Sequence, residues 1–236
     1  CDWSSDVCSS DLWTFDSSFT AKQLFATIWI STFRIFKLVE KMKIPLINYV
    51  QGYENYFENG SIYNSVALAN KLADERIAVS TYLKKKMEKI FNYDSSVISN
   101  GVNVDLIRHI NTNEKPINLT FVMRGNVMKG DYLIPDIITE LDKQVEGLNI
   151  NVVYMSKEIE LPRIKNNIMN KVLGPISRSE MVNILQNTDI YVDTSMNDGF
   201  GLIGLEAIVS GAVCVMSDSF GDRKSTRLNS SHTNLS

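Results

Sequence analysis

The sequence has little cysteine, little histidine and no long apolar run. Among its 236 residues only 3 are cysteine and 2 are histidine, which gives neither a disulfide framework nor a zinc-binding pattern. The stretch richest in apolar residues, 24–39, is interrupted by Arg34 and Lys37. No segment therefore has the roughly 20 apolar residues that span a bilayer. The N-terminus also lacks the basic region and apolar run of a signal peptide.

The chain also carries little excess charge. Its 24 basic and 27 acidic side chains give a net charge of -3, which lacks the basic field typical of a nucleic-acid-binding protein. Hydrophobic residues make up 44% of the chain and charged residues 22%. Both fractions are ordinary for a soluble globular protein of one or two domains. We therefore expect no nucleic acid among its partners.

The two ends have neither helical nor strand periodicity. The chain opens CDWSSDVCSSDL and closes GDRKSTRLNSSHTNLS, and both segments resemble a common sequencing adapter translated in one frame or from its reverse complement. We therefore exclude residues 1–12 and 222–236 from functional reasoning and expect them to pack against nothing. Natural serine-rich disordered tails are the alternative. The exclusion leaves Cys214, whose apolar run AVCVM indicates a core residue, and His109, which we assign to the surface.

Helical and strand patterns alternate in two series that a connector, residues 103–116, separates. The first series predicts a long helix over 15–43 that Pro45 stops, and the second begins with the strand INLTFVM. Strands that alternate with helices indicate parallel sheets covered on both faces. The fold class is therefore α/β with two units. The remaining predicted elements are strands at 46–51, 75–80, 96–99, 148–155, 189–195 and 212–218, a short strand or turn at 171–176, and helices at 61–71, 81–91, 132–145, 178–186 and 202–210.

The segment SMNDGFGLIGLEAIVSGAVCVMSD carries the most chemical information. A predicted strand ends at Ser195, and the loop NDGFG then leads into a helix. Ligands of open parallel sheets bind beyond the carboxyl ends of the strands. The free N–H groups near Gly201 and Leu202 would face a phosphate at the start of that helix.

Two carboxylates of this segment are candidates for sugar contacts. Glu206 adjoins the apolar stripe of the predicted helix, where a carboxylate is costly unless it is paired or hydrogen-bonded. The two hydroxyls of a ribose would satisfy it, and a solvated or loop-capping glutamate is the alternative. Asp198 at the loop tip could accept hydrogen bonds from sugar hydroxyls. The alternative is an ordinary turn residue before Gly199.

Several segments in order resemble the retaining glycosyltransferase family 4, which has the GT-B fold. The run DGFGLIGLEA is similar to the family's E-x(7)-E segment, with Asp198 at the position of its first Glu and Glu206 at the second. RGNVMKG resembles the family's G-R-x-x-x-x-K-G segment, and ISNGVNVDL resembles its interdomain segment. RIAVSTYLKKKM and YVQGYE resemble further family segments. The resemblance covers nearly all of residues 45–221.

The resemblance implies two Rossmann-like domains that face a cleft, both incomplete. Residues 13–102 would form the C-terminal part of the acceptor-side domain, 103–116 the connector, and 117–221 a truncated nucleotide-sugar-binding domain. The family's first strand and Gly-rich loop would precede residue 13, and its closing helices would follow residue 221. We expect Gln51, Arg124, Lys129 and Glu206 to face the cleft, with a hinge near residues 100–104.

The resemblance also implies roles for individual residues. Arg124 and Lys129 would hold the donor diphosphate, Asp198 would face the transferred sugar, and Glu206 would bind the ribose. The turn ending at Ile176 would lie beside the base. Solvated loop residues are the alternative for the two cations, and a loop-structuring pair is the alternative for Gln51 and Glu54. The catalytic set is Arg124, Lys129 and Asp198, and the donor-binding set is Glu206, Gly199, Phe200, Gly201, Leu202, Ile176, Gln51 and Glu54.

The function implied is a hexosyltransferase-type glycosyltransferase. It would move a sugar from a nucleotide-sugar donor to a glycan or lipid-linked acceptor with retention, in cell-surface polysaccharide synthesis. Neither a metal nor a cofactor is implied. A non-catalytic nucleotide-sugar-binding protein of the same fold is the alternative, because Asp198 replaces the usual Glu. A GT-B epimerase would need catalytic acids and a histidine in the cleft, and the sequence offers no such set.

The sequence also suggests where in the cell the protein acts. We expect a cytoplasmic protein, and the basic run YLKKKMEK at residues 82–89 could contact the inner face of the cell membrane. A solvated helix face is the alternative for that run.

Overall fold

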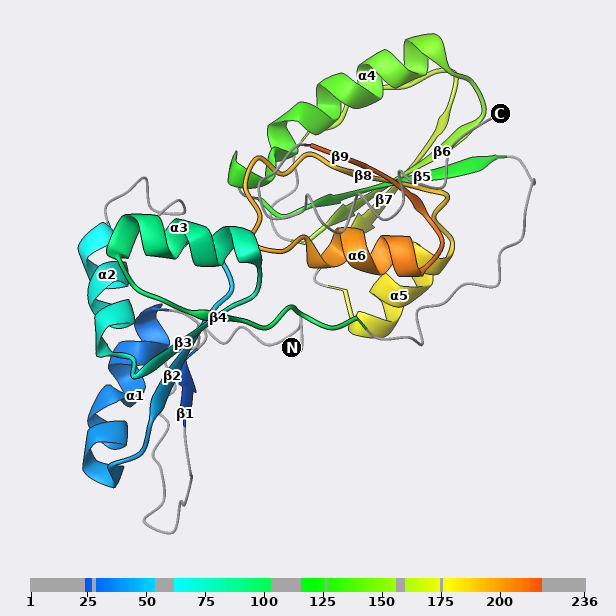
Figure 1. Ribbon diagram of the computed structural model, residues 1–236. Helices are drawn as coiled ribbons and strands as arrows, with labels where there is room; N and C mark the ends of the chain where they lie inside the picture. Colours follow the sequence, from blue (N-terminus) through cyan, green and yellow to red (C-terminus); the bar gives the residue numbers. More distant parts are fainter. Residues whose placement is uncertain are drawn as a thin grey trace, which may run out of the picture. The chain divides into compact units, whose positions relative to one another are not determined.

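The computed structural model describes residues 24–26, 29–53, 62–102, 116–125, 127–155, 160–174 and 176–217. Two compact units divide this part of the chain, an N-terminal unit ending at Asn100 and a C-terminal unit beginning at Gly101 (Figure 1). The predictions made for residues 1–12 and 222–236, for His109 and for Glu54 lie outside the described residues. So does nearly all of the connector.

The N-terminal unit contains a parallel sheet of four strands in the order β1-β2-β3-β4. Ala26, Val39, Leu46 and Ala73 form its buried core, and Ile35, Phe36 and Ile44 pack against them. The strands are β1 (Leu24–Ala26), β2 (Leu46–Val50), β3 (Glu75–Ala78) and β4 (Ser96–Val97), and the helices are α1 (Trp29–Met42), α2 (Tyr63–Leu72) and α3 (Thr81–Phe91).

The helix predicted over residues 15–43 was too long. Residues 24–26 form the strand β1, which pairs in parallel with β2 in the register Leu24 to Leu46, and α1 begins only at Trp29. A short apolar run fits a buried strand and a helix equally well by periodicity. Pairing with β2 is a long-range interaction, and here it decides the conformation.

The C-terminal unit contains a parallel sheet of five strands in the order β7-β6-β5-β8-β9. Its strands are β5 (Ile117–Met123), β6 (Leu148–Tyr154), β7 (Ile168–Leu173), β8 (Ile190–Asp193) and β9 (Val213–Met216). Its helices are α4 (Ile134–Gln144), α5 (Arg178–Gln186) and α6 (Leu202–Val209), with short 3-10 turns at Val127–Lys129 and Asp131–Leu133.

Helices cover both faces of this sheet (Figure 1). Phe121 of β5 packs with Ile138 of α4 in one buried cluster. Val122, the next residue of β5, packs with Leu185 of α5 and Ile203 of α6 in the other. Successive side chains of a strand point to opposite faces, so the unbroken apolar run of β5 supplies both layers. The α/β fold with parallel sheets is therefore confirmed.

The strand order places a switch point between β5 and β8. From central β5 the chain moves outward through β6 and β7, and then returns to the other side of β5 as β8 and β9. Loops that leave neighbouring strands in opposite directions open a crevice at their carboxyl ends, where ligands of doubly wound sheets bind. The loops after β5 and β8 are residues 124–130 and 194–201, which we call the β5 loop and the β8 loop.

Two hydrogen bonds, one from a side chain and one from the backbone, join these two loops. Thr194 Oγ1 donates to the Lys129 carbonyl oxygen at 3.0 Å, and Met196 N donates to the Met128 carbonyl oxygen at 2.9 Å. Gly130 has a φ of +66°, and a Cβ added there would lie 2.0 Å from the Thr194 carbonyl oxygen. The contact therefore requires a glycine for its conformation and for its space.

Gly130→Ala should destabilise the chain more than Gly147→Ala. Gly147 also has a positive φ of +77°, but an added Cβ would meet nothing within 4 Å. Both variants should lose about 1 kcal/mol to left-handed strain, and Gly130→Ala should lose about 1–3 kcal/mol more through overpacking. Urea unfolding of the two variants measures the difference. Equal losses of unfolding free energy in the two variants would mean that the β5 loop and the β8 loop can separate without a free-energy cost.

Candidate functional site

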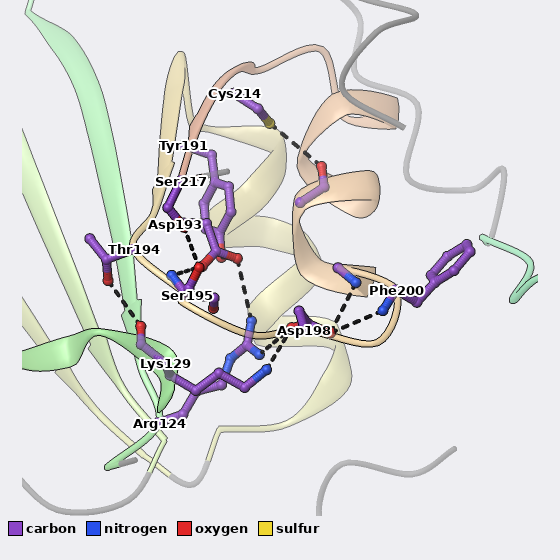
Figure 2. A network of polar contacts seen from close by, with 12 residues as sticks. Arg124, Lys129, Tyr191, Asp193, Thr194, Ser195, Asp198, Phe200, Cys214 and Ser217 are labelled. Atoms are coloured by element: carbon purple, nitrogen blue, oxygen red, sulfur yellow. Dashed lines mark hydrogen bonds and ion pairs between the residues drawn. The ribbon is translucent and has the colours of Figure 1, made fainter. Parts of the chain in front are cut away.

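A mostly buried carboxylate, Asp198, joins the two loops at the switch point. Lys129 Nζ lies 2.6 Å from Asp198 Oδ2, and an Arg124 Nη atom lies 3.3 Å from the same oxygen. Figure 2 shows both cations reaching Asp198 from the β5 loop. All three side chains are less than a fifth exposed. The structure thus brings together the three residues of the predicted catalytic set.

The other oxygen of Asp198 binds the start of helix α6. The backbone N–H groups of Phe200 and Gly201 each donate to Asp198 Oδ1 at 3.1 Å. Gly201 precedes α6 with a φ of +74°. One carboxylate therefore engages both cations and two of the free amides that an anion would meet at this helix terminus.

Asp193, the last residue of β8, is a further carboxylate in contact with Arg124. Its Oδ2 atom lies 3.8 Å from an Arg124 Nη atom, and its Oδ1 atom accepts the Ser195 N–H at 2.8 Å. The fully buried Tyr191 hydroxyl donates to Asp193 Oδ2 at 3.4 Å. Asp193 was not among the predicted site residues. Its one signal in the sequence is a charged residue at the end of the strand DIYVDTS.

The β5 loop is held in place by a second buried carboxylate. Asp131 Oδ2 accepts the backbone N–H groups of Arg124 at 2.8 Å and Gly125 at 2.6 Å. Arg124 Nε and Asp131 Oδ1 are buried and have no hydrogen-bond partner among the described residues. An unpaired buried donor of this kind is a position where a ligand oxygen could bind.

The charges of the cluster reinforce one another. Burial disfavours the ionised carboxylate of Asp198, but Lys129 and Arg124 outweigh that effect and hold its pKa well below the ordinary value. Burial likewise disfavours the charged guanidinium, but neighbouring groups including Asp193 and Asp198 hold the pKa of Arg124 above its ordinary value. Asp198 and Arg124 are therefore both ionised at neutral pH.

Glu206 of α6 is buried and paired. Its side chain is 3% exposed, and its two carboxylate oxygens lie 2.7 and 2.8 Å from the two terminal nitrogens of Arg178. The solvated alternative for Glu206 is therefore wrong. Arg178, the first residue of α5, was not predicted from the sequence.

A small pocket lies beside this pair. Its volume of about 10 Å³ is close to the space that one water molecule needs. The buried Ile176 contributes to it, and the predicted place of this residue beside the base stays a prediction. The lining residues are Met155, Ile176, Ser177, Arg178, Met181, Ile203 and Glu206.

The remaining predicted residues fall into two groups. Gly199, Phe200, Gly201 and Leu202 lie in or directly after the β8 loop, while Gln51 is exposed at the end of β2 in the other unit. The shared cleft and the hinge therefore stay predictions. Cys214 is partly buried against the α5 and α6 core, and burial raises the pKa of its thiol to about 12.

Two further features concern metals and membranes. No group of three or more His, Cys, Asp or Glu side chains within the described ranges could hold a metal ion. No helix in that part of the chain is long and apolar enough to cross a membrane.

On α3, Lys84 pairs with Asp94 and Glu88, and Lys86 lies over the rings of Tyr53 and Tyr82.

The doubly wound parallel sheet of the C-terminal unit is that of the class of Rossmann-like α/β proteins. Within that class, the sequence matches the family Glycosyl transferases group 1 over residues 105–230, more than half of the chain. The chain belongs to this family. No curated protein sequence is significantly similar to it.

Solved structures share the fold at low sequence identity. Anabaena Alr3699/HepE, solved with UDP and glucose, has 15% identity and a TM-score of 0.66, over 85% of this chain and 60% of its own. Sucrose-phosphate synthase from Thermosynechococcus elongatus has 16% identity and a TM-score of 0.64, over 85% of this chain and 57% of its own. The likeness confirms the GT-B fold class, and the chain spans about 60% of the length of these proteins.

Asp198→Asn should lower stability in a pH-dependent way. At about pH 7 the variant removes the carboxylate that pairs with both Lys129 and Arg124, which should cost about 1–3 kcal/mol. The depressed pKa of Asp198 means that its contribution is complete above an unfolded-state pKa of about 3.9 and is lost as the pH falls below it. Urea unfolding between about pH 7 and about pH 3 should show that the difference in unfolding free energy between Asp198→Asn and the unaltered chain becomes smaller as the pH falls.

The control is Asp136→Asn, which alters an exposed aspartate of α4. It should change stability by less than about 0.5 kcal/mol at either pH. A difference in unfolding free energy between the Asp198→Asn chain and the unaltered chain that stays the same down to acid pH would contradict the ionised state assigned to Asp198.

Proposed function

We propose that the C-terminal unit binds the nucleotide-sugar donor of a hexosyltransferase. The observation that carries the proposal is the mostly buried pair Arg124 and Lys129, which Asp198 joins to the amides before α6 at the switch point. Two cations and the free amides of a helix terminus form a site for a dianionic diphosphate. The family supports this assignment, and so does the binding of UDP and glucose by the similar Anabaena protein.

The reaction proposed is sugar transfer with retention. The acceptor hydroxyl attacks the anomeric carbon on the face from which the diphosphate departs, so that no enzymic nucleophile is needed, unlike in retaining glycosidases. Arg124 and Lys129 stabilise the negative charge that grows on the leaving diphosphate. They supply the countercharge that a metal ion supplies at other phosphate sites, and we propose that neither a metal nor a cofactor takes part.

The acceptor and the location are proposed on the family resemblance. The acceptor would be a glycan or a lipid-linked sugar, and the process would be cell-surface polysaccharide synthesis on the cytoplasmic side of the membrane. A non-catalytic donor-binding protein is the second candidate. It is favoured by one observation, Asp198 at the position where the family usually has Glu. Turnover by the full-length gene product separates the two candidates.

Lys129→Ala and Glu206→Ala should affect different kinetic constants in the full-length gene product. Lys129 acts on charge that develops in the transition state, so its loss should lower kcat by about a hundredfold or more. Glu206 is proposed to bind ribose before and during the reaction alike, so its loss should raise the KM for the donor by roughly ten- to a hundredfold. Steady-state kinetics with a panel of nucleotide sugars measures both constants.

Two surface variants serve as matched controls. Lys143 and Glu140 form an exposed pair on α4 of the same unit. Replacing either with alanine should leave both kinetic constants within about twofold, because surface substitutions have small effects. Full turnover by Lys129→Ala together with full donor affinity in Glu206→Ala would show that the site is assigned wrongly.

The diphosphate must exchange with Asp198 on binding. This carboxylate binds Lys129, Arg124 and the amides of Phe200 and Gly201. It is therefore an internal anion at the position proposed for the phosphates. On this proposal the sugar contact expected of Asp198 forms only after the diphosphate has taken over the two cations.

Asp198→Asn should therefore tighten the binding of pyrophosphate and of UDP to the chain. Removing the competing charge should raise the affinity roughly tenfold, the value of about one charge-assisted hydrogen bond. Isothermal titration calorimetry at low salt measures it, and Arg124→Ala in the same background should abolish the gain. Weaker binding by Asp198→Asn would mean that Asp198 orients the cations for the phosphate and does not compete with it.

A further inference from the structure

The Asp131 carboxylate binds the backbone at the start of the β5 loop. Its Oδ2 atom accepts the Arg124 N–H at 2.8 Å and the Gly125 N–H at 2.6 Å. Asp131 is 2% exposed, and it lies seven positions after Arg124 along the chain. One carboxylate oxygen therefore closes the β5 loop, which carries Lys129 as well as Arg124, into a ring.

The chain on both sides of Asp131 is held in place. On one side, Gly130 packs so closely against Thr194 that a Cβ would not fit. On the other side, the 3-10 turn Asp131–Leu133 leads directly into α4, whose first residue, Ile134, is 1% exposed in the core. Asp131 therefore lies on a rigid segment, and its carboxylate can fix the more distant start of the loop.

The two cations of the site are held by different backbone hydrogen bonds. Lys129 is tied to the β8 loop, because its carbonyl oxygen accepts the Thr194 hydroxyl at 3.0 Å. Arg124 follows directly after β5, and its own N–H is bound by Asp131. The position of the Arg124 backbone beyond the sheet therefore depends on the Asp131 carboxylate.

The Arg124 side chain makes few close polar contacts of its own. Its two terminal nitrogens face Asp198 at 3.3 Å and Asp193 at 3.8 Å, and both distances are longer than that of an ideal charge-assisted hydrogen bond. Its Nε atom is buried and has no hydrogen-bond partner among the described residues. The place of the guanidinium thus depends strongly on the backbone that carries it. A misplacement of about 1 Å in a binding group can cost about a hundredfold in rate.

We propose that Asp131 is a positioning residue of the diphosphate site and that it acts through Arg124. It holds the Arg124 backbone where the guanidinium reaches the same anion as Lys129. Asp131 itself contacts neither the diphosphate nor the reacting atoms. The inference rests on the proposed function, and it adds the residue that fixes one of the two cations.

The same contact determines which groups of the β5 loop meet the phosphates. In many doubly wound proteins, the backbone of the loop after the first strand approaches the phosphates of the ligand. Here the amides of Arg124 and Gly125 are already bound by Asp131. The diphosphate is therefore met by the Arg124 side chain and not by the Arg124 amide.

The test uses inorganic pyrophosphate and UDP as probes, titrated into the chain by calorimetry at low salt. Asp131→Ala should weaken the binding of both about tenfold, the value of about one charged hydrogen bond, because the Arg124 guanidinium is no longer held in place. Asp131→Asn keeps a side-chain oxygen that can accept both amides, so its affinity should stay within about twofold of that of the unaltered chain.

A double-mutant cycle separates positioning from a general effect on the fold. In an Arg124→Ala background, Asp131→Ala should cost no further affinity, because residues that act as a unit are not additive. In a Lys129→Ala background, Asp131→Ala should still weaken binding about tenfold, because Arg124 is then the remaining cation of the pair.

Asp142→Ala is the matched control. Asp142 also accepts two successive backbone N–H groups of a loop in the same unit, those of Lys165 at 2.8 Å and Asn166 at 3.0 Å. That loop precedes β7 and so lies at the amino ends of the strands, opposite the site. Asp142→Ala should lower thermal stability and leave the affinity for pyrophosphate within about twofold.

The outcomes distinguish this proposal from the proposed function. If neither pyrophosphate nor UDP binds the unaltered chain, the proposed function fails and the role of Asp131 fails with it. If both bind and Asp131→Ala leaves their affinity unchanged, only the positioning role is overturned. Further weakening in the Arg124→Ala background also overturns it, because Asp131 would then act on another part of the site. So does a folded Asp131→Asn chain with about tenfold weaker binding, because both amides keep an acceptor there.

Discussion

Burial of the Asp198 carboxylate between Arg124 and Lys129 is the constraint on which the C-terminal unit depends. Charges removed from water are costly unless they are paired and hydrogen-bonded. The surrounding residues are arranged to meet that condition. Asp131 fixes the backbone of the β5 loop, Gly130 lets the two loops touch, and the carboxylate oxygens of Asp198 are shared between the two cations and the start of α6.

A second ion pair, the buried Glu206 with the partly exposed Arg178, follows the same rule on neighbouring helices. Both carboxylates proposed to meet the donor are therefore satisfied before any donor arrives. Binding at such a site replaces internal partners with ligand groups, so its net free energy is a difference between two similar sets of contacts. The internal partners also keep the loops ordered without ligand, which reduces the ordering entropy that binding would otherwise cost.

The sequence predicted the architecture better than it predicted the partners within the site. Alternating patterns located nearly every strand and helix of the C-terminal unit, because periodicity reflects local geometry. The strand β1 was missed because a pairing with β2 decides it. Arg178 and Asp193 were missed for a related reason. Arg178 lies 28 positions from Glu206 along the chain, and Asp193 meets Arg124 only across β5 and β8. Arg124 and Lys129 became candidates through a family resemblance, whereas Glu206 was first suggested by its place beside the apolar stripe of its helix.

The aspartate at position 198 changes the ligand-free state of the site more than its set of ligand contacts. Aspartate accepts hydrogen bonds from amides two or three residues ahead in its own chain, as Asp198 does from Phe200 and Gly201. Glutamate is one methylene longer and makes this local contact less readily. A glutamate here would leave the amides at the start of α6 free, whereas Asp198 occupies them together with Lys129. The shorter side chain therefore couples the proposed phosphate position to the β8 loop itself, so that a phosphate bound there would also have to release the two amides before α6.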